Sequence, residues 1–170
     1  DCDNNGSNEV TGATGSYTCI YGAAGTYTIR IKDNTGVGAG FPRIRFGGGG
    51  DRLKILTVAQ WGTGQWTSME SAFSGCSNLT ITASDAPNLL AVTSLQGTFL
   101  NATSLNQSLN SWNTSNVTTM QSMFQGATAF NQSLNSWNTG NVTNMTAMFQ
   151  SAILDGPAGA QRSRVRVGEL

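Results

Sequence analysis

Apolar residues recur with a period of about 25 residues through most of the chain. Residues 106–124 read NQSLNSWNTSNVTTMQSMF and residues 131–149 read NQSLNSWNTGNVTNMTAMF, so fifteen of nineteen positions are identical. The same register continues backwards in more degenerate form, giving four units between residues 50 and 152. Because such a short unit cannot bury its own apolar face, we expect the units to stack on one another. The expected core positions are Phe73, Phe99, Trp112, Met120, Phe124, Trp137, Met145 and Phe149.

Each unit contains signals for a short helix, an extended stretch and a turn. Met120 is followed by Met123 and Phe124, at the i, i+3, i+4 spacing of a helix, and then by a glycine; residues 68–75 and 144–151 are similar. Residues 130–134 are extended, and residues 79–82 alternate as a strand does. Asn and Gly between residues 135 and 142 favour a turn. The pattern predicts an α/β repeat solenoid, like a leucine-rich repeat, with parallel strands on one face and short helices on the other.

The chain before the repeats has a different pattern. Residues 16–21, 26–32 and 42–46 alternate with period two and are separated by Gly-rich turns. We interpret residues 1–49 as a small antiparallel β cap that covers the apolar end of the first repeat. Residues 50–152 are then the repeat domain, and residues 153–170 an irregular basic tail in which Arg alternates with small or apolar residues.

Charge is scarce in the repeats and balanced overall. Nine Lys and Arg offset nine Asp and Glu, and His is absent. A chain without a basic surplus is a poor nucleic-acid binder. No apolar run approaches the roughly 20 residues of a membrane helix. Like charges stacked at one repeat position would repel, whereas Asn side chains can stack in ladders. The predicted ladders pair Asn106 with Asn131, Asn110 with Asn135, Asn113 with Asn138, and Asn116 with Asn141.

The repeat resembles one found in bacterial surface proteins. Its motif is Phe130-Asn-Gln-x-Leu134-x-x-Trp137-Asn-Thr-x-Asn-Val142-Thr-x-Met145-x-x-Met148-Phe149. This motif is similar to the repeat of about 26 residues in BspA-like leucine-rich-repeat surface proteins and lipoproteins. The region before the repeats resembles, weakly, a PKD-like or immunoglobulin-like β region. The resemblance implies a bacterial cell-surface or secreted protein that contacts host, matrix or other cells.

Acidic and amide side chains near the N-terminus suggest a metal loop. Asp1, Asp3, Asn5 and Glu9 alternate around Gly6 as hard oxygen ligands do in Ca²⁺ loops, although Gly12 stands where an EF-hand has its bidentate Glu. The alternative is a hairpin turn built by Asn and Asp side chains. Calcium is the one cofactor that the sequence suggests.

Cysteine usage points to an oxidising compartment. Cys2 and Cys19 both lie in the β-rich head, and we predict a disulfide between them. The alternative is two unrelated thiols. Cys76 falls at a repeat core position and is expected to be a small buried apolar residue.

The sequence favours a binding function over catalysis. Between residues 55 and 161 the acids are Glu70, Asp85 and Asp155 alone, and no nucleophile has a base beside it, so we expect no enzyme. We predict an extracellular adhesion or binding module for a protein or glycan partner. The alternative is a carbohydrate- or ice-binding repeat surface. The expected exposed ligand contacts are Trp66, Thr118 and Thr143. An end-on homodimer is a further expectation, because a final uncapped unit leaves apolar surface and unpaired edge groups.

Overall fold

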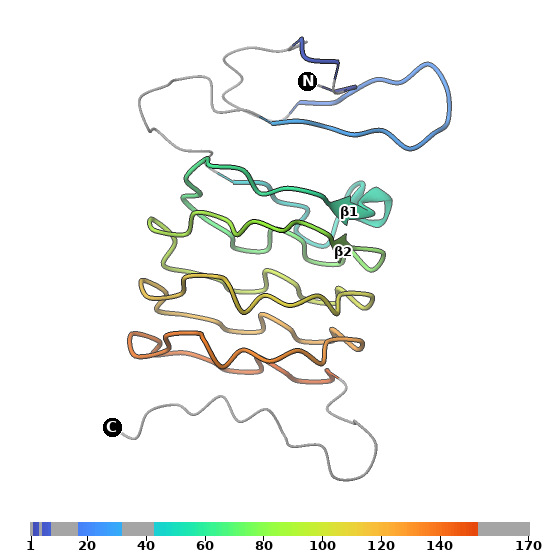
Figure 1. Cartoon of the computed structure of the whole chain (residues 1–170). Helices are drawn as coiled ribbons and strands as arrows, with labels where there is room; N and C mark the ends of the chain where they lie inside the picture. Colours follow the sequence, from blue (N-terminus) through green and yellow to red (C-terminus); the bar gives the residue numbers. More distant parts are fainter. Residues whose placement is uncertain (1, 4, 8–16, 32–42, 153–170) are drawn as a thin grey trace. The chain divides into compact units, whose positions relative to one another are not determined.

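The structure is a computed structural model that describes residues 2, 3, 5–7, 17–31 and 43–152 (Figure 1). Two compact units divide the chain, Asp1–Ala39 and Gly40–Leu170. Sequence analysis places the first boundary at residue 49, whereas the structure groups residues 43–49 with the second unit. The predicted basic tail, residues 153–170, lies outside the described residues.

Regular secondary structure is sparse in the described part of the chain. It consists of a single 3₁₀ turn, η1 (Arg52–Lys54), and two short strands, β1 (Thr57–Val58) and β2 (Thr80–Ile81). The two strands pair in parallel, with Thr57 opposite Thr80. Isolated parallel bridges join Ser94 to Thr119 and Thr119 to Asn144 further along the chain. The fold is therefore mostly irregular, with one small parallel sheet, and parallel pairing is the part of the predicted class that is confirmed.

The segments predicted to be short helices, residues 68–75, 119–126 and 144–151, are instead chains of tight turns. We call the turn ribbon the four equivalent runs of turns at residues 69–76, 95–102, 120–127 and 145–152. In the third of these, Met123 N–H donates to Met120 C=O at 3.2 Å and Ala127 N–H to Phe124 C=O at 3.0 Å. The third residue of each turn is left-handed, with φ of 52° at Ser122 and 70° at Gly126. An α-helix keeps φ negative throughout, so the predicted helices are wrong.

Hydrogen bonds between successive repeats explain why turns replace helices. Met120, Ser122 and Phe124 donate their N–H groups to the carbonyls of Asn144, Thr146 and Met148, at 2.8–2.9 Å. In a helix, these N–H groups would donate to carbonyls of the same repeat. The ribbon thus bonds alternate N–H groups internally and sends the others to the next unit. Figure 1 shows the result for residues 43–152, a series of coils that lie one above another.

The core of the second unit is a column of aromatic rings. Phe73 stacks on Phe99 at 5.8 Å between ring centroids, Phe99 on Phe124 at 5.8 Å, and Phe124 on Phe149 at 5.5 Å. Of the eight predicted core residues, six are buried, namely Phe73, Phe99, Trp112, Met120, Phe124 and Trp137. The other two, Met145 and Phe149, lie on the last described coil and are partly buried. Cys76 is fully buried among them.

The first coil is closed by residues 43–48. Phe46 N–H donates to Ala72 C=O at 3.0 Å, and its ring lies 6.3 Å from that of Phe73. Gly48 N–H donates to Ser74 C=O at 3.0 Å. Residues 43–48 thus cover the first coil without forming a strand, and Gly47 and Gly48 follow with left-handed φ of 55° and 77°.

The first unit contains no strand among its described residues. The predicted strands at residues 16–21 and 26–32 are described over residues 17–21 and 26–31, and neither of these segments is a strand. The contacts here are made by side chains: the rings of Tyr21 and Tyr27 stack at 3.8 Å, and the Tyr27 hydroxyl donates to Ala23 C=O at 2.8 Å. The predicted antiparallel β cap is therefore not found in the described residues.

Candidate binding surface

Three threonines in the same position of successive coils form an exposed row. We call Thr93, Thr118 and Thr143 the threonine ladder; all three are exposed. Thr118 donates both its N–H, at 2.8 Å, and its hydroxyl, at 3.1 Å, to Thr93 C=O. Thr143 binds Thr118 C=O in the same way, at 2.8 and 3.2 Å. The hydroxyl protons of Thr118 and Thr143 are therefore used in hydrogen bonds within the molecule. The ladder presents methyl groups and hydroxyl lone pairs to solvent.

Asparagine side chains flank the ladder and are oriented by the backbone. Asn116 Nδ2 donates to Leu90 C=O at 2.8 Å, and Asn141 Nδ2 donates to Ser115 C=O at 2.7 Å. Both side chains are exposed, and each has its amide N–H directed at the preceding coil. Within the described residues their Oδ1 atoms accept no hydrogen bond, so these atoms add acceptors to the surface. The face is thus an uncharged array of acceptors and methyl groups.

Of the four predicted asparagine pairs, all within the described residues, a hydrogen bond joins one, and the other three are not paired. Asn106 Oδ1 accepts from Asn131 N–H at 2.8 Å, which joins that predicted pair. Asn110 Oδ1 accepts from Ser136 N–H at 2.9 Å rather than from Asn135. Asn138 caps its own turn, accepting from Gly140 N–H at 2.9 Å. Amide groups here satisfy backbone groups of the turns, because those groups would otherwise be unpaired.

Trp66 is buried, which corrects the expectation that it is exposed for ligand binding. Its neighbour Gln65 bridges to Asn88 in the next coil, and Trp66 N–H donates to Asn88 C=O at 3.0 Å. This register turns the indole inward against Trp61, with 5.9 Å between ring centroids. The remaining tryptophans, Trp61, Trp112 and Trp137, are buried too. No tryptophan therefore offers an exposed platform for sugar rings.

Asp85, which the sequence suggests only as a lone acid, holds a turn in place. Its two carboxylate oxygens accept from Trp61 N–H at 3.0 Å and Gly62 N–H at 2.7 Å. Burial by itself would raise the pKa of Asp85, but these backbone donors and its own N–H lower the pKa below the ordinary value of 3.8. An ionised carboxylate with both oxygens engaged is poorly placed for acid–base chemistry.

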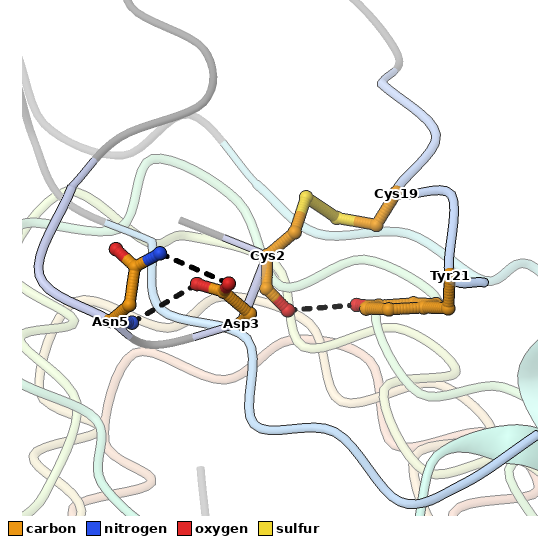
Figure 2. Close-up of a disulfide and its surroundings, with 5 residues drawn as sticks. All are labelled: Cys2, Asp3, Asn5, Cys19 and Tyr21. Carbon is orange, nitrogen blue, oxygen red and sulfur yellow. Dashed lines mark hydrogen bonds between the residues drawn. A yellow bond between two sulfur atoms is a disulfide. The ribbon is translucent and has the colours of Figure 1, made fainter. Parts of the chain in front are cut away.

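The suggested calcium loop is described only in part. Asp1 and Glu9 lie outside the described residues. Asp3 Oδ1 accepts from Asn5 N–H at 3.1 Å, and Asp3 Oδ2 from Asn5 Nδ2 at 3.0 Å, as Figure 2 shows. In the described residues Asp3 and Asn5 thus face each other in an Asx turn. No group of three or more His, Cys, Asp or Glu there could hold a metal ion.

A disulfide joins Cys2 and Cys19, the pair for which the sequence predicts one (Figure 2). The Tyr21 hydroxyl donates to Cys2 C=O at 2.9 Å beside it. Cys76 is a free thiol. Burial raises its pKa to about 11, while the charge of Arg52 acts in the opposite direction. This thiol is therefore protonated at neutral pH and unsuited to nucleophilic chemistry.

Sequence reasoning missed Thr93 as a member of the ladder. The reason is that residues 91–93 read Ala-Val-Thr, where the two later units have Asn-Val-Thr. The Val-Thr pair at an offset of 25 residues from Thr118 was the available signal. The structure brings Thr93, Thr118 and Thr143 together, and leaves Trp66 out of this surface.

A family model described as "Mycoplasma protein of unknown function, DUF285" matches residues 54–155, more than half of the chain. The chain belongs to the DUF285 family. The DUF285 match begins at η1, covers all four ribbon segments and includes the threonine ladder. No curated protein and no solved structure matches the chain. In the described residues, no helix of the DUF285 protein is long and apolar enough to cross a membrane.

Proposed function

We propose that this DUF285 protein is a non-enzymatic binding or adhesion module of the bacterial cell surface. On this proposal its stacked coils are a leucine-rich-repeat-like solenoid of the BspA-like type. The observation that carries it is the exposed, uncharged threonine ladder, fixed by backbone hydrogen bonds at 2.8 Å. A rigid row of this kind can bind by area and needs no deep pocket.

The chemistry of the surface favours a partner that supplies hydrogen-bond donors. The ladder and its flanking Asn residues present oxygen acceptors and methyl groups, and no charge lies among them. Backbone N–H groups, Lys or Arg side chains of a protein, or hydroxyls of a glycan would match it. Of these we favour a protein, because all four tryptophans are buried and a glycan site usually offers a ring for stacking.

Two groups in the described repeats that could carry chemistry have structural positions instead, as the proposal expects. Asp85 is engaged by two backbone N–H groups, and Cys76 is buried and protonated. The Cys2–Cys19 disulfide supports an extracellular location, because such bonds persist in oxidising compartments.

The test compares two exposed threonine rows by surface plasmon resonance against panels of extracellular-matrix proteins and glycans. The test variant is Thr118→Glu with Thr143→Glu. The matched control is Thr103→Glu with Thr128→Glu, which are exposed on a different row of the coils. We expect the test variant to lose binding to a matrix protein at least tenfold, and the control to retain it. Equal loss in both variants, or no binding to any panel member by the unmodified protein, would contradict the proposal.

A second candidate is an ice-binding surface, favoured by the same observation. Parallel neighbours lie about 4.8 Å apart, so the ladder presents methyl and hydroxyl groups in a regular row. Thermal hysteresis of the purified protein tests this candidate directly. Hysteresis that disappears in Thr118→Glu would replace the adhesion proposal, and freezing indistinguishable from buffer would remove the candidate.

A further inference from the structure

The Asn5 side chain is held by hydrogen bonds at both ends of its amide. Asp3 Oδ2 accepts from Asn5 Nδ2 at 3.0 Å, and Asp3 Oδ1 accepts from Asn5 N–H at 3.1 Å (Figure 2). Asn5 Oδ1 accepts from Ser7 N–H at 2.8 Å. A bond from Oδ1 to the N–H two residues on closes an Asx turn. The amide of Asn5 is therefore fixed beside the backbone that follows it.

Glycine is the residue that suits the next position of this turn. Gly6 has a φ of 98°, a left-handed conformation that residues with a Cβ rarely adopt. Asn5 and Gly6 are both exposed to solvent. They also form the one Asn-Gly pair of the whole sequence. Because glycine has no Cβ, its nitrogen is the least hindered backbone nitrogen that can follow an asparagine.

We propose that Asn5 is a site of spontaneous deamidation, in which the backbone nitrogen of Gly6 is the nucleophile and water the co-reactant. The Gly6 nitrogen loses its proton to solvent and bonds to Asn5 Cγ. The Cγ–Nδ2 bond then breaks, and Nδ2 takes a proton from solvent and leaves as ammonia, so that a cyclic imide remains. Water adds to either imide carbonyl and breaks its bond to the Gly6 nitrogen, which gives aspartate or isoaspartate at position 5. This inference does not depend on the proposed function.

The Ser7 N–H is placed to assist the attack. As the Gly6 nitrogen bonds to Cγ, negative charge develops on Asn5 Oδ1, the atom to which Ser7 N–H already donates at 2.8 Å. A fixed backbone donor at this distance stabilises an oxyanion as it forms. The turn also restricts rotation of the side chain, which lowers the entropy that ring closure must lose. Both effects favour the reaction in the folded chain over the reaction in the unfolded chain.

The repeats contain the same turn without the glycine. Four further asparagines of the described residues accept at Oδ1 from the N–H two residues on, at 2.9–3.3 Å: Asn88, Asn113, Asn138 and Asn144. The residues that follow them are all buried or partly buried and all have a Cβ: Leu89, Thr114, Thr139 and Met145. These side chains obstruct an approach to the backbone nitrogen. Asn138, whose bond from Gly140 N–H is 2.9 Å, is therefore an internal control for Asn5.

Deamidation changes the charge of this turn. The Asn5 amide donates to Asp3 Oδ2 at 3.0 Å, whereas a carboxylate in its place donates nothing and is repelled by Asp3. The reaction therefore removes this contact and adds a negative charge within the loop that the Cys2–Cys19 disulfide closes.

The experiment incubates the purified full chain at mildly alkaline pH. Peptide mass spectrometry follows Asn5 and Asn138, with aspartate and isoaspartate products separated by chromatography. We expect Asn5 to convert at least about tenfold faster than Asn138, and at least as fast in the native protein as in the reduced chain unfolded in guanidinium chloride. Slower conversion in the native protein would mean that the turn protects Asn5, and this would overturn the proposal. Equal rates at Asn5 and Asn138 would also overturn it.

Three variants separate the effect of the sequence from that of the turn. Gly6→Ala should slow the conversion of Asn5 at least about tenfold. The matched control is Gly22→Ala, which changes an exposed glycine of the same unit with open space at its Cβ position and should leave the rate unchanged. Ser7→Pro keeps the Asn-Gly pair but removes the N–H donor, and should slow the reaction at least about threefold in the native protein and not in the unfolded chain. An unchanged native rate in Ser7→Pro would show that the Asn-Gly pair alone sets the rate, which contradicts the proposal. Retention of the disulfide, read from the intact mass, checks that the first unit of each variant keeps its cross-link.

Discussion

The sharpest test of the fold exchanges residues at left-handed positions of the turn ribbon. Ala147 has a φ of 57° and stands at the third position of a turn closed by Met148 N–H on Met145 C=O. Left-handed backbone costs a residue with a Cβ about 1–2 kcal/mol, a cost that Ala147→Gly removes. The larger conformational entropy of Gly in the unfolded chain reduces this stabilisation by about 0.4–1 kcal/mol. The substitution should therefore stabilise the protein by about 0.5 kcal/mol.

A helix at this place would give the opposite sign. Gly in a helix interior costs about 1 kcal/mol relative to Ala. The two structures thus predict free energies of unfolding for Ala147→Gly that differ by about 1.5 kcal/mol. Urea unfolding followed by tryptophan fluorescence resolves this, because the expected shift in midpoint is about 0.3 M upward for the turn ribbon.

The reciprocal variant, Gly126→Ala, is the control, because the turn ribbon predicts that it changes the free energy of unfolding in the opposite direction. Gly126 has a φ of 70°, and a Cβ there would collide with the Asn101 side chain and lie 3.6 Å from its Cα. We expect destabilisation by about 1 kcal/mol, net of the entropy gained in the unfolded chain. A loss of about 1 kcal/mol in Ala147→Gly would refute the turn ribbon and restore the helix.

Three further predictions concern single side chains. Asp85→Asn should destabilise the protein by about 1 kcal/mol at pH 7, because one of two backbone N–H groups loses its acceptor. Because folding lowers the pKa of Asp85, the stability that the ionised carboxylate contributes is present above the ordinary pKa of 3.8 and is lost as pH falls through the folded pKa. The urea midpoints of the variant and the unmodified protein should therefore converge below that pH. A constant difference between the two midpoints at all pH values would contradict this reasoning. Cys76, with a pKa of about 11, should react with a thiol reagent at pH 8 at least about 100-fold more slowly in the native than in the unfolded protein; similar rates would mean that the thiol is accessible. Trp137→Phe should cost about 1 kcal/mol, since Trp137 Nε1 donates to Leu109 C=O at 2.8 Å, and an unchanged midpoint in urea would show that this bond contributes nothing.

The repeat period predicted the stacking of the chain but not its local conformation. Phe73, Phe99 and Phe124 follow from the period alone, because equivalent positions of stacked units must share one environment. The spacing of Met120, Met123 and Phe124 suits a helix and a run of turns equally. What separates the two is the small or Gly/Asn residue at every fourth position, such as Ser122 and Gly126, which marks left-handed backbone.

The candidate surface was only partly predictable. Thr118 and Thr143 were expected to be exposed, and the Val-Thr pair fixes them because Val117 points inward and the next residue must point outward. Trp66 was expected outside because it falls out of the repeat register. Its burial depends on the bridge between Gln65 and Asn88, a long-range contact that periodicity does not contain.

The hydrogen bonds of the turn ribbon all run from one coil to the next, and this direction affects how the number of repeats can change by duplication. Along the turn ribbon, each interior coil accepts N–H groups from the coil before it and donates N–H groups to the coil after it, and residues 43–48 donate to the ribbon carbonyls of the first coil. An in-frame duplication of residues 103–127 would therefore insert one additional coil, whose ribbon N–H and C=O groups already match those of both neighbouring coils. Length can change in steps of one coil without any compensating substitution, and the exposed threonine row would lengthen with it.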